Sequence, residues 1–349
     1  MIRPPIVPGI CAAALAFAAA AGPAAAQEPP PPPAHPSAVT GWARAPVAGE
    51  PLRDAPDVVA AAVAAIAWPG LGGRVQRVAR GADGEVWVRV AFPDGVRGWA
   101  PGTALIAAPA PAALAPGTRR RLTRLTASLG TSTALVVRDP LGRTLFAAGT
   151  RTPLSIASVT KLATVTAALE RRGVTLPAAA AILRPSDNDR AQALSTRVGD
   201  GSRALGALRA IETAAALGAT MTLVDGSGLS PANRASAGEV ADLLLGLRDT
   251  AGFRTIFRAM PVASRSGTLQ YRMAGTAAAG RLRAKTGTLF DPPRASALAG
   301  YVWPHGSGLS PDRALVVVML SNRVSPYAAR AAQDAVATAL AASGALTAG

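Results

Sequence analysis

The stretch from Ser155 to Leu162 constrains this chain more than any other. It opens a predicted helix that continues to Glu170. Ser158 and Lys161 stand three positions apart, which on a helix places both side chains on one face, one turn apart. A serine hydroxyl becomes a nucleophile only with a base within hydrogen-bond reach, and a lysine amine can be that base if burial lowers its pKa. The pair alone is also typical of a solvated helix surface, so it needs support from elsewhere in the chain.

Two further motifs give that support. Ser186-Asp187-Asn188 follows Arg184-Pro185, and Lys285-Thr286-Gly287-Thr288 ends the run that starts at Gly280. Ser-x-x-Lys, Ser-Asp-Asn and Lys-Thr-Gly, in this order, form the known signature of class A β-lactamases and penicillin-binding proteins. Three short motifs in the right order are far more specific than one. They favour one shared site.

The chain from Ser158 onward resembles the serine-type D-Ala-D-Ala carboxypeptidase/endopeptidase family, the low-molecular-mass class C penicillin-binding proteins. The resemblance covers roughly residues 118–345. Besides the three motifs, it rests on the loop Asp225-Gly-Ser-Gly-Leu-Ser-Pro-Ala-Asn-Arg234, on Gly267-Thr-Leu with Arg272, and on Leu298-Ala-Gly-Tyr-Val302. It implies a β-lactamase/transpeptidase-like fold, peptidoglycan stem peptides as substrates, and covalent binding of β-lactam antibiotics.

Carried onto this sequence, the resemblance implies a catalytic role for each motif. Ser158 would attack the carbonyl between two D-alanines, and Lys161 would take its proton. Ser186 would relay a proton to the leaving amine. Asn188 would hold the substrate amide and the lysine. Lys285 would raise the local positive potential and help to bind the terminal carboxylate.

The residues after Lys285 complete the implied site. Thr286 and Thr288 would hydrogen-bond the terminal carboxylate of the substrate. The backbone N–H groups of Ser158 and Thr288 would form an oxyanion hole, which typically lowers a barrier by a few kcal/mol. Gly287 would leave room for substrate against the strand. The implied reaction uses no metal and no cofactor.

Each role has a structural alternative. Ser186 and Asn188 belong to the residue types that cap helices, and Lys285 could be an ordinary cation at the end of a strand. Asp225 and Arg234 are interpreted as anchors of a Gly-rich loop.

One departure from the family concerns the segment between the first two motifs, which has only 24 residues (186 − 161 − 1). The large extra domains that the family usually carries there are absent, so the choice between trimming stem peptides and cutting crosslinks stays open.

The pattern of the catalytic region favours an α+β fold. Residues 118–129 and 328–342 predict terminal helices, and residues 187–273 predict a mostly helical block. Strands are predicted at 134–139 and 144–147, which form a hairpin, and at 281–284, 296–303 and 314–320. This order suits one antiparallel sheet flanked by helices, with a second all-helical lobe.

The chain begins with a predicted secretory signal peptide, residues 1–26, which has Arg3 near its start and Ala24-Ala25-Ala26 at its end. We therefore expect an exported, periplasmic or envelope-associated protein with no transmembrane span after signal removal. The sole cysteine, Cys11, lies in the signal. The mature chain then has neither disulfides nor thiol catalysis. Residues 27–40 form a proline-rich linker.

Residues 41–106 predict a small all-β domain, because alternating strands are separated by the turn dipeptides Asp83-Gly84 and Asp94-Gly95. The domain resembles the bacterial SH3-like domains of envelope enzymes, which implies binding to the cell wall; the alternative is a packing spacer. Its alanine-rich run at 58–67 looks helical. We interpret Trp68, Trp87 and Trp99 as core residues. Residues 107–117 form an Ala/Pro linker to the catalytic domain, residues 118–345.

The charge and the histidine content argue against several classes of protein function. The formal charge of +16 falls to +15 without Arg3, and it suits either anionic envelope polymers or a bias of the genome towards arginine. Nucleic acid is not expected, because there is no dense basic helix. His35 and His305 are the sole histidines, and both lie in loop-like contexts. A Ser-His-Asp triad and a histidine metal site are therefore not expected.

Two rival functions remain. A class A-like β-lactamase needs a glutamate that directs water onto the acyl-enzyme. Between Asn188 and Lys285 the sole glutamates are Glu212 and Glu239, and neither is followed by the Leu-Asn pattern that such a residue carries. The second rival is a catalytically silent cell-wall-binding protein.

Overall fold

The computed structural model describes residues 42–44, 49–66, 72–91, 96–108, 114–149 and 152–344. The predicted signal peptide and the proline-rich linker lie outside these residues, as does Trp68. Among the described residues, none of the helices combines the length and the hydropathy that crossing a bilayer requires.

The N-terminal module is an antiparallel sheet, as the turn dipeptides predict. Its strands are β1 (Trp42–Arg44), β2 (Pro51–Arg53), β3 (Ala62–Ala65), β4 (Gly72–Arg80), β5 (Val86–Ala91), β6 (Arg97–Pro101) and β7 (Ile106–Ala108), in the spatial order β3-β2-β6-β5-β4-β1-β7. Leu52, Val88 and Val90 lie in its core. Trp87 and Trp99 are buried, as predicted. The SH3-like classification stays a prediction.

Two expectations for this region are wrong. In the alanine-rich run at 58–67, the described residues 58–66 are not helical: they form a turn and then β3, which pairs with β2. So short a run makes a marginal helix, whereas the neighbouring strand supplies hydrogen bonds directly. The expected linker 107–117 is also too long, because β7 reaches Ala108 and helix α1 begins at Pro116, whose fixed φ suits the first turn of a helix.

The catalytic region is built on a second antiparallel sheet, as predicted. Its strands are β8 (Thr133–Arg138), β9 (Thr144–Ala148), β12 (Leu282–Leu289), β13 (Ala295–Val302) and β14 (Leu315–Asn322), in the order β12-β13-β14-β8-β9. Every residue of β13 and β14 is buried, because helices cover both faces. Strand β12 is longer than predicted. It continues through the whole Lys285–Thr288 motif, which was expected to follow the strand.

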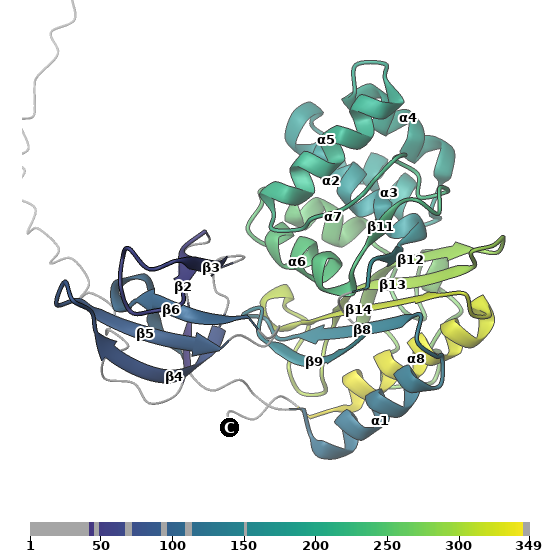
Figure 1. Ribbon diagram of the computed structural model, residues 1–349. Coiled ribbons are helices and arrows are strands. Elements are labelled where there is room, and N and C mark those ends of the chain that lie inside the picture. Colours follow the sequence, from purple (N-terminus) through teal and green to yellow (C-terminus); the bar gives the residue numbers. More distant parts are fainter. Residues whose placement is uncertain are drawn as a thin grey trace, which may run out of the picture. The chain divides into compact units, whose positions relative to one another are not determined.

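Helices lie on both faces of this sheet (Figure 1). On one face pack α1 (Pro116–Ala127) and α8 (Pro326–Ala342). The other face carries the helical lobe: α2 (Thr160–Arg172), α3 (Leu176–Leu183), α4 (Asn188–Val198), α5 (Arg203–Ala216), α6 (Ala237–Leu247) and α7 (Phe253–Ala259). Alternate residues of β14 serve the two cores, with Val316 and Val318 facing the lobe and Val317 facing α8.

Candidate active site

Ser158 lies in a tight turn between the helical lobe and the edge of the sheet. The chain leaves strand β10 (Leu154–Ser155), passes through the 3-10 turn η3 (Ala157–Val159), and enters α2 at Thr160. Ser158 therefore precedes the α-helix, whereas the sequence placed it in the first helical turn. Ala157 has a φ of +45°, a conformation that costs a non-glycine residue free energy and is common at functional sites.

Two glycines let the backbone close around this turn. A Cβ on Gly287 of β12 would come within 3.0 Å of the Ser158 nitrogen, and one on Gly228 would come within 2.8 Å of the Ser158 Cα. Gly228 also has a φ of +84°, which favours glycine. The Ser158 turn is therefore packed directly against β12 on one side and the 225–230 loop on the other.

Lys161 connects these segments. Its side chain has no exposed surface, and its Nζ atom lies 2.8 Å from Ser158 Oγ and 2.7 Å from Asn188 Oδ1. Nζ also donates to the carbonyl oxygen of Ser227. Burial lowers the pKa of Lys161 to about 8, although the carboxylates of Asp225 and Asp187 act to raise it. The pKa of Lys161 therefore lies close enough to neutral pH for both the neutral amine and the ammonium form to be populated.

Ser186 and Asn188 stand where α3 gives way to α4. Ser186 has a φ of +66°. Asn188 is the first residue of α4, and the cap of that helix is Asp187, whose side chain accepts from the Arg190 N–H at 2.8 Å. The capping alternative therefore applies to the middle residue of the motif. Its outer two residues face the lysines.

Lys285 is the second buried lysine of the site. It is fully buried, and its Nζ donates to Ser186 Oγ at 2.8 Å and to the Thr286 carbonyl at 2.6 Å. Burial, together with the charge of Lys161, lowers the pKa of Lys285 well below its usual value. Lys285 and Ser186 thus form a pair beside the pair of Lys161 and Ser158.

The loop after Val224 is held by one carboxylate. Asp225 accepts hydrogen bonds from the N–H groups of Ser227, Gly228 and Ser230 and from the Ser227 hydroxyl, at 2.6–2.9 Å. Burial acts to raise the pKa of Asp225, but these hydrogen bonds outweigh it and the pKa is lowered. The loop anchor predicted for Asp225 is confirmed, and so is that of Arg234, which donates to the Pro153 carbonyl at 2.6 Å.

The threonines of the third motif contact residues that the sequence did not single out for the site. Thr286 Oγ1 shares a hydrogen bond of 2.6 Å with Thr268 Oγ1. Thr288 Oγ1 accepts from the Arg330 guanidinium at 3.0 Å. That guanidinium lies 5.6 Å from the ring centre of Phe290 and 5.8 Å from that of Tyr327, distances that suit a cation–π contact.

The structure thus brings every predicted site residue to one place, where α2, α4 and β12 meet. Sequence reasoning missed four contributors, namely the Ser227 carbonyl, Asn233, Thr268 and Arg330. Buried Asn233 accepts from the Val224 N–H at 2.8 Å and donates to Thr160 Oγ1 at 3.1 Å, so it joins the loop to α2. The motif that ends in Asn233-Arg234 was the signal for it. Arg330 had no such signal, because α8 lies far along the chain.

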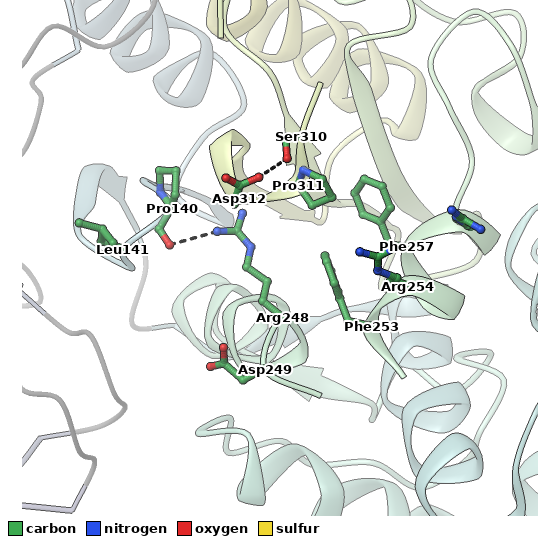
Figure 2. A pocket seen from close by; sticks show the side chains of 11 residues that line it. Pro140, Leu141, Arg248, Asp249, Phe253, Arg254, Phe257, Ser310, Pro311 and Asp312 are labelled. Carbon is green, nitrogen blue, oxygen red and sulfur yellow. Dashed lines mark hydrogen bonds between the residues drawn. The ribbon is translucent and has the colours of Figure 1, made fainter. Parts of the chain in front are cut away.

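A large pocket lies away from this cluster. It has a volume of about 680 Å³ and is lined by Arg248, Phe253, Phe257 and Pro311, among others. Figure 2 shows the two phenylalanine rings and Arg248 facing the same space. None of the residues of the three motifs lines this pocket, so cavity size alone does not locate the chemistry. Among the described residues there is also no group of three or more metal-ligating side chains.

Comparison with known proteins agrees with the geometry. Residues 178–343 match the family described as D-Ala-D-Ala carboxypeptidase 3 (S13). These residues of the chain are similar to that family. It is 32% identical over 269 residues to a D-alanyl-D-alanine carboxypeptidase of Actinomadura sp. (strain R39), covering 62% of this chain and 48% of that protein.

A second relative and one solved structure extend the comparison. The carboxypeptidase DacB of Mycolicibacterium smegmatis is 36% identical over 179 residues, which cover 46% of this chain and 36% of the relative. The chain thus spans half or less of the curated relatives it matches. The TLA-3 extended-spectrum β-lactamase is 10% identical with a TM-score of 0.51, over 64% of this chain and 96% of the other. That similarity shows the β-lactamase/transpeptidase-like fold.

Proposed function

We propose that this protein is a serine D-Ala-D-Ala carboxypeptidase that acts through an acyl-enzyme on Ser158. The observation that carries the proposal is the set of contacts around Lys161. Its nitrogen faces one hydroxyl and two oxygen atoms that can only accept, Asn188 Oδ1 and the Ser227 carbonyl.

This set of partners suits a neutral amine. A neutral lysine has two N–H donors and one lone pair. The two donors satisfy the Asn188 and Ser227 oxygens, so the lone pair is left to face the Ser158 hydroxyl. The Ser158 proton then moves to Lys161 Nζ as the Ser158 oxygen bonds to the substrate carbonyl carbon.

The second pair serves the leaving group. As the C–N bond breaks, the departing D-alanine amine needs a proton. Ser186 relays it: its hydroxyl gives one proton to the amine and is reprotonated by the proton that Lys161 took from Ser158. The Lys285 amine donates an N–H to Ser186 Oγ, so the Ser186 hydrogen can point towards the leaving group. Water then hydrolyses the ester on Ser158. This second step returns the serine and releases the shortened peptide.

Strand β12 offers the substrate a docking edge. It is the edge strand of the five-stranded sheet. Residues 261–263 use the outer groups of Leu282 and Ala284, so the outer row is left for another chain beyond Ala284. A stem peptide can pair there, while the missing side chain of Gly287 gives its space to the Ser158 turn. The N–H groups of Ser158 and Thr288 serve as the oxyanion hole, and the terminal carboxylate is bound beside Thr286 and Thr288. We place this reaction on peptidoglycan outside the cytoplasm, with D-alanyl crosslinks as a further substrate.

Two glutamates bear on the rival β-lactamase function. Glu239 accepts from the Ser236 N–H in the capping box of α6, and Glu212 pairs with Arg171 and Arg209. Neither contacts Ser158 or Lys161 in the described residues. We therefore expect penicillin to acylate Ser158 and to leave slowly.

The decisive experiment measures both activities on the same protein. The wild type should release D-alanine from a D-Ala-D-Ala peptide and show a stable penicillin adduct by mass spectrometry, and Ser158→Ala should do neither. An adduct that clears within seconds would favour a β-lactamase. Unchanged wall binding by Ser158→Ala, without D-alanine release by the wild type, would favour the silent binding protein.

A further inference from the structure

One face of the N-terminal sheet collects arginines in register. Across the strands, Arg77 of β4 stands opposite Arg89 of β5, and Arg89 stands opposite Trp99 of β6. In the next row along the same face, Arg74 stands opposite Ala91, and Ala91 stands opposite Arg97. All four arginines are exposed. The other face carries Val88 and Val90 and is the core of the module.

Ala91 leaves an opening between the arginines, which we call the cradle. Its side chain is a single methyl group, and the residue is partly buried. Arg74 and Arg97 flank it across the strands, and Arg89 precedes it by two residues on its own strand. Neighbouring strands lie about 4.8 Å apart and side chains on one face repeat about every 6.7 Å along a strand. Three guanidinium groups can therefore surround one anionic group seated above Ala91.

Within the described residues, none of the four arginines of this face forms an ion pair, because the ion pairs found there all lie within residues 138–334. Asp83 and Glu85, the described acidic residues nearest to these arginines in sequence, lie between β4 and β5. Like charges directly opposite each other, such as Arg77 and Arg89, destabilise a sheet. An anionic partner bound to this face would offset the repulsion between the arginines.

We propose that this face binds a linear polyanion that carries closely spaced phosphate groups. A planar guanidinium binds phosphate through two parallel N–H···O bonds, and several such contacts along one chain add together. A lipid surface is disfavoured, because Trp99, which stands opposite Arg89, is 7% exposed and is too buried to insert into a bilayer. The inference does not depend on the chemistry at Ser158.

The test uses the full chain and inorganic polyphosphate as the probe, with binding followed by calorimetry. We expect micromolar binding whose affinity falls roughly fifteenfold between 50 and 200 mM salt, if about three phosphates are neutralised. Ala91→Glu adds a carboxylate to the centre of the cradle without removing an arginine. It should weaken binding at least tenfold, and Arg89→Gln should weaken it about threefold to tenfold.

Matched controls separate the cradle from net charge. Ala127→Glu makes the same charge change at an exposed position near the end of α1, and Arg120→Gln removes an exposed arginine from that helix. Both should bind polyphosphate within twofold of the wild type. Equal losses in the controls and in Ala91→Glu would overturn the proposal. So would tighter binding to vesicles of anionic phospholipid, or to a single-stranded oligonucleotide of matched charge, than to polyphosphate.

Folding and activity are checked in the same samples. Unchanged circular dichroism and unchanged penicillin acylation of Ala91→Glu would show that the module and the catalytic region are intact. A variant that fails this check is replaced by Arg74→Gln with Arg97→Gln, which leaves the strand backbone and Ala91 untouched. Wild-type-like binding by that double variant would also overturn the proposal.

Discussion

The Nζ atom of Lys161 lies 2.8 Å from the hydroxyl oxygen of Ser158, and no part of the lysine side chain reaches solvent. Burial is what makes this distance chemically useful, since it lowers the pKa of the amine to about 8.

The rate of penicillin acylation should depend on pH through Lys161. A neutral amine is required, and its fraction is roughly 1% at pH 6 and one half near pH 8. The acylation rate constant should therefore rise about tenfold per pH unit below pH 8 and level off above it. Stopped-flow measurements from pH 6 to pH 10 would check this. A flat profile would count against Lys161 as the base, and Lys161→Arg, which keeps a permanent charge, should be inactive.

Asp225→Asn should destabilise the protein in a pH-dependent way. The folded-state pKa of Asp225 is lowered, so its carboxylate stabilises the fold fully above the unfolded-state pKa of about 4 and loses this effect as pH falls through the folded-state pKa. We expect a loss of about 1–3 kcal/mol at pH 7 that narrows towards pH 3, measured by urea unfolding. A difference that stays constant between these pH values would contradict the charge-based explanation.

Gly287→Ala should slow acylation without unfolding the protein. The new methyl group would come 2.9 Å from the Ile156 carbonyl and 3.0 Å from the Ser158 nitrogen, so β12 and the Ser158 turn must separate by a few tenths of an ångström. Displacement on this scale at a reacting group can cost up to about a hundredfold in rate. Gly238→Ala in α6 is the matched control, because its nearest neighbour is 3.6 Å away. Equal rates for the two variants would contradict this reading of the contact.

Arg330→Gln should impair recognition of the terminal carboxylate. The guanidinium donates to Thr288 Oγ1, next to the place where we position that carboxylate, and charged hydrogen bonds are about twice as strong as neutral ones. We expect the KM for a D-Ala-D-Ala peptide to rise about tenfold with a smaller change in kcat. Arg330→Lys should recover part of the loss. Arg254→Gln, in the separate pocket, serves as control. If Arg330→Gln raises the KM for a peptide amidated at its C-terminus as much as it raises the KM for the free acid, Arg330 does not recognise the carboxylate.

Local patterns predicted the parts of this fold that depend on local rules. Three-residue spacing placed Ser158 and Lys161 together even though Ser158 lies just before the helix, because a 3-10 turn also brings positions i and i+3 to one side. The turn residues Pro140-Leu141-Gly142 predicted β8 and β9 as a hairpin. In contrast, the alanine-rich run favours a helix by residue type, and the pairing of β3 with β2 overrode that preference.

The contacts that complete the site could not be predicted in the same way. The Ser227 carbonyl is a backbone group, so residue type gives no indication of where it points. Thr268 and Arg330 meet Thr286 and Thr288 across 18 and 42 positions of sequence. Such meetings depend on how α8 and η4 (Gly267–Leu269) pack against β12. Residue identity supplies the chemistry, but tertiary packing chooses the partners.

The closeness of Gly228 and Gly287 to the Ser158 turn has an evolutionary consequence. The nucleophile is positioned by main-chain contacts with two segments, and main-chain atoms do not change when side chains are substituted elsewhere. Side chains in the helical lobe can therefore be substituted in evolution while the atoms of the Ser158 turn keep their places.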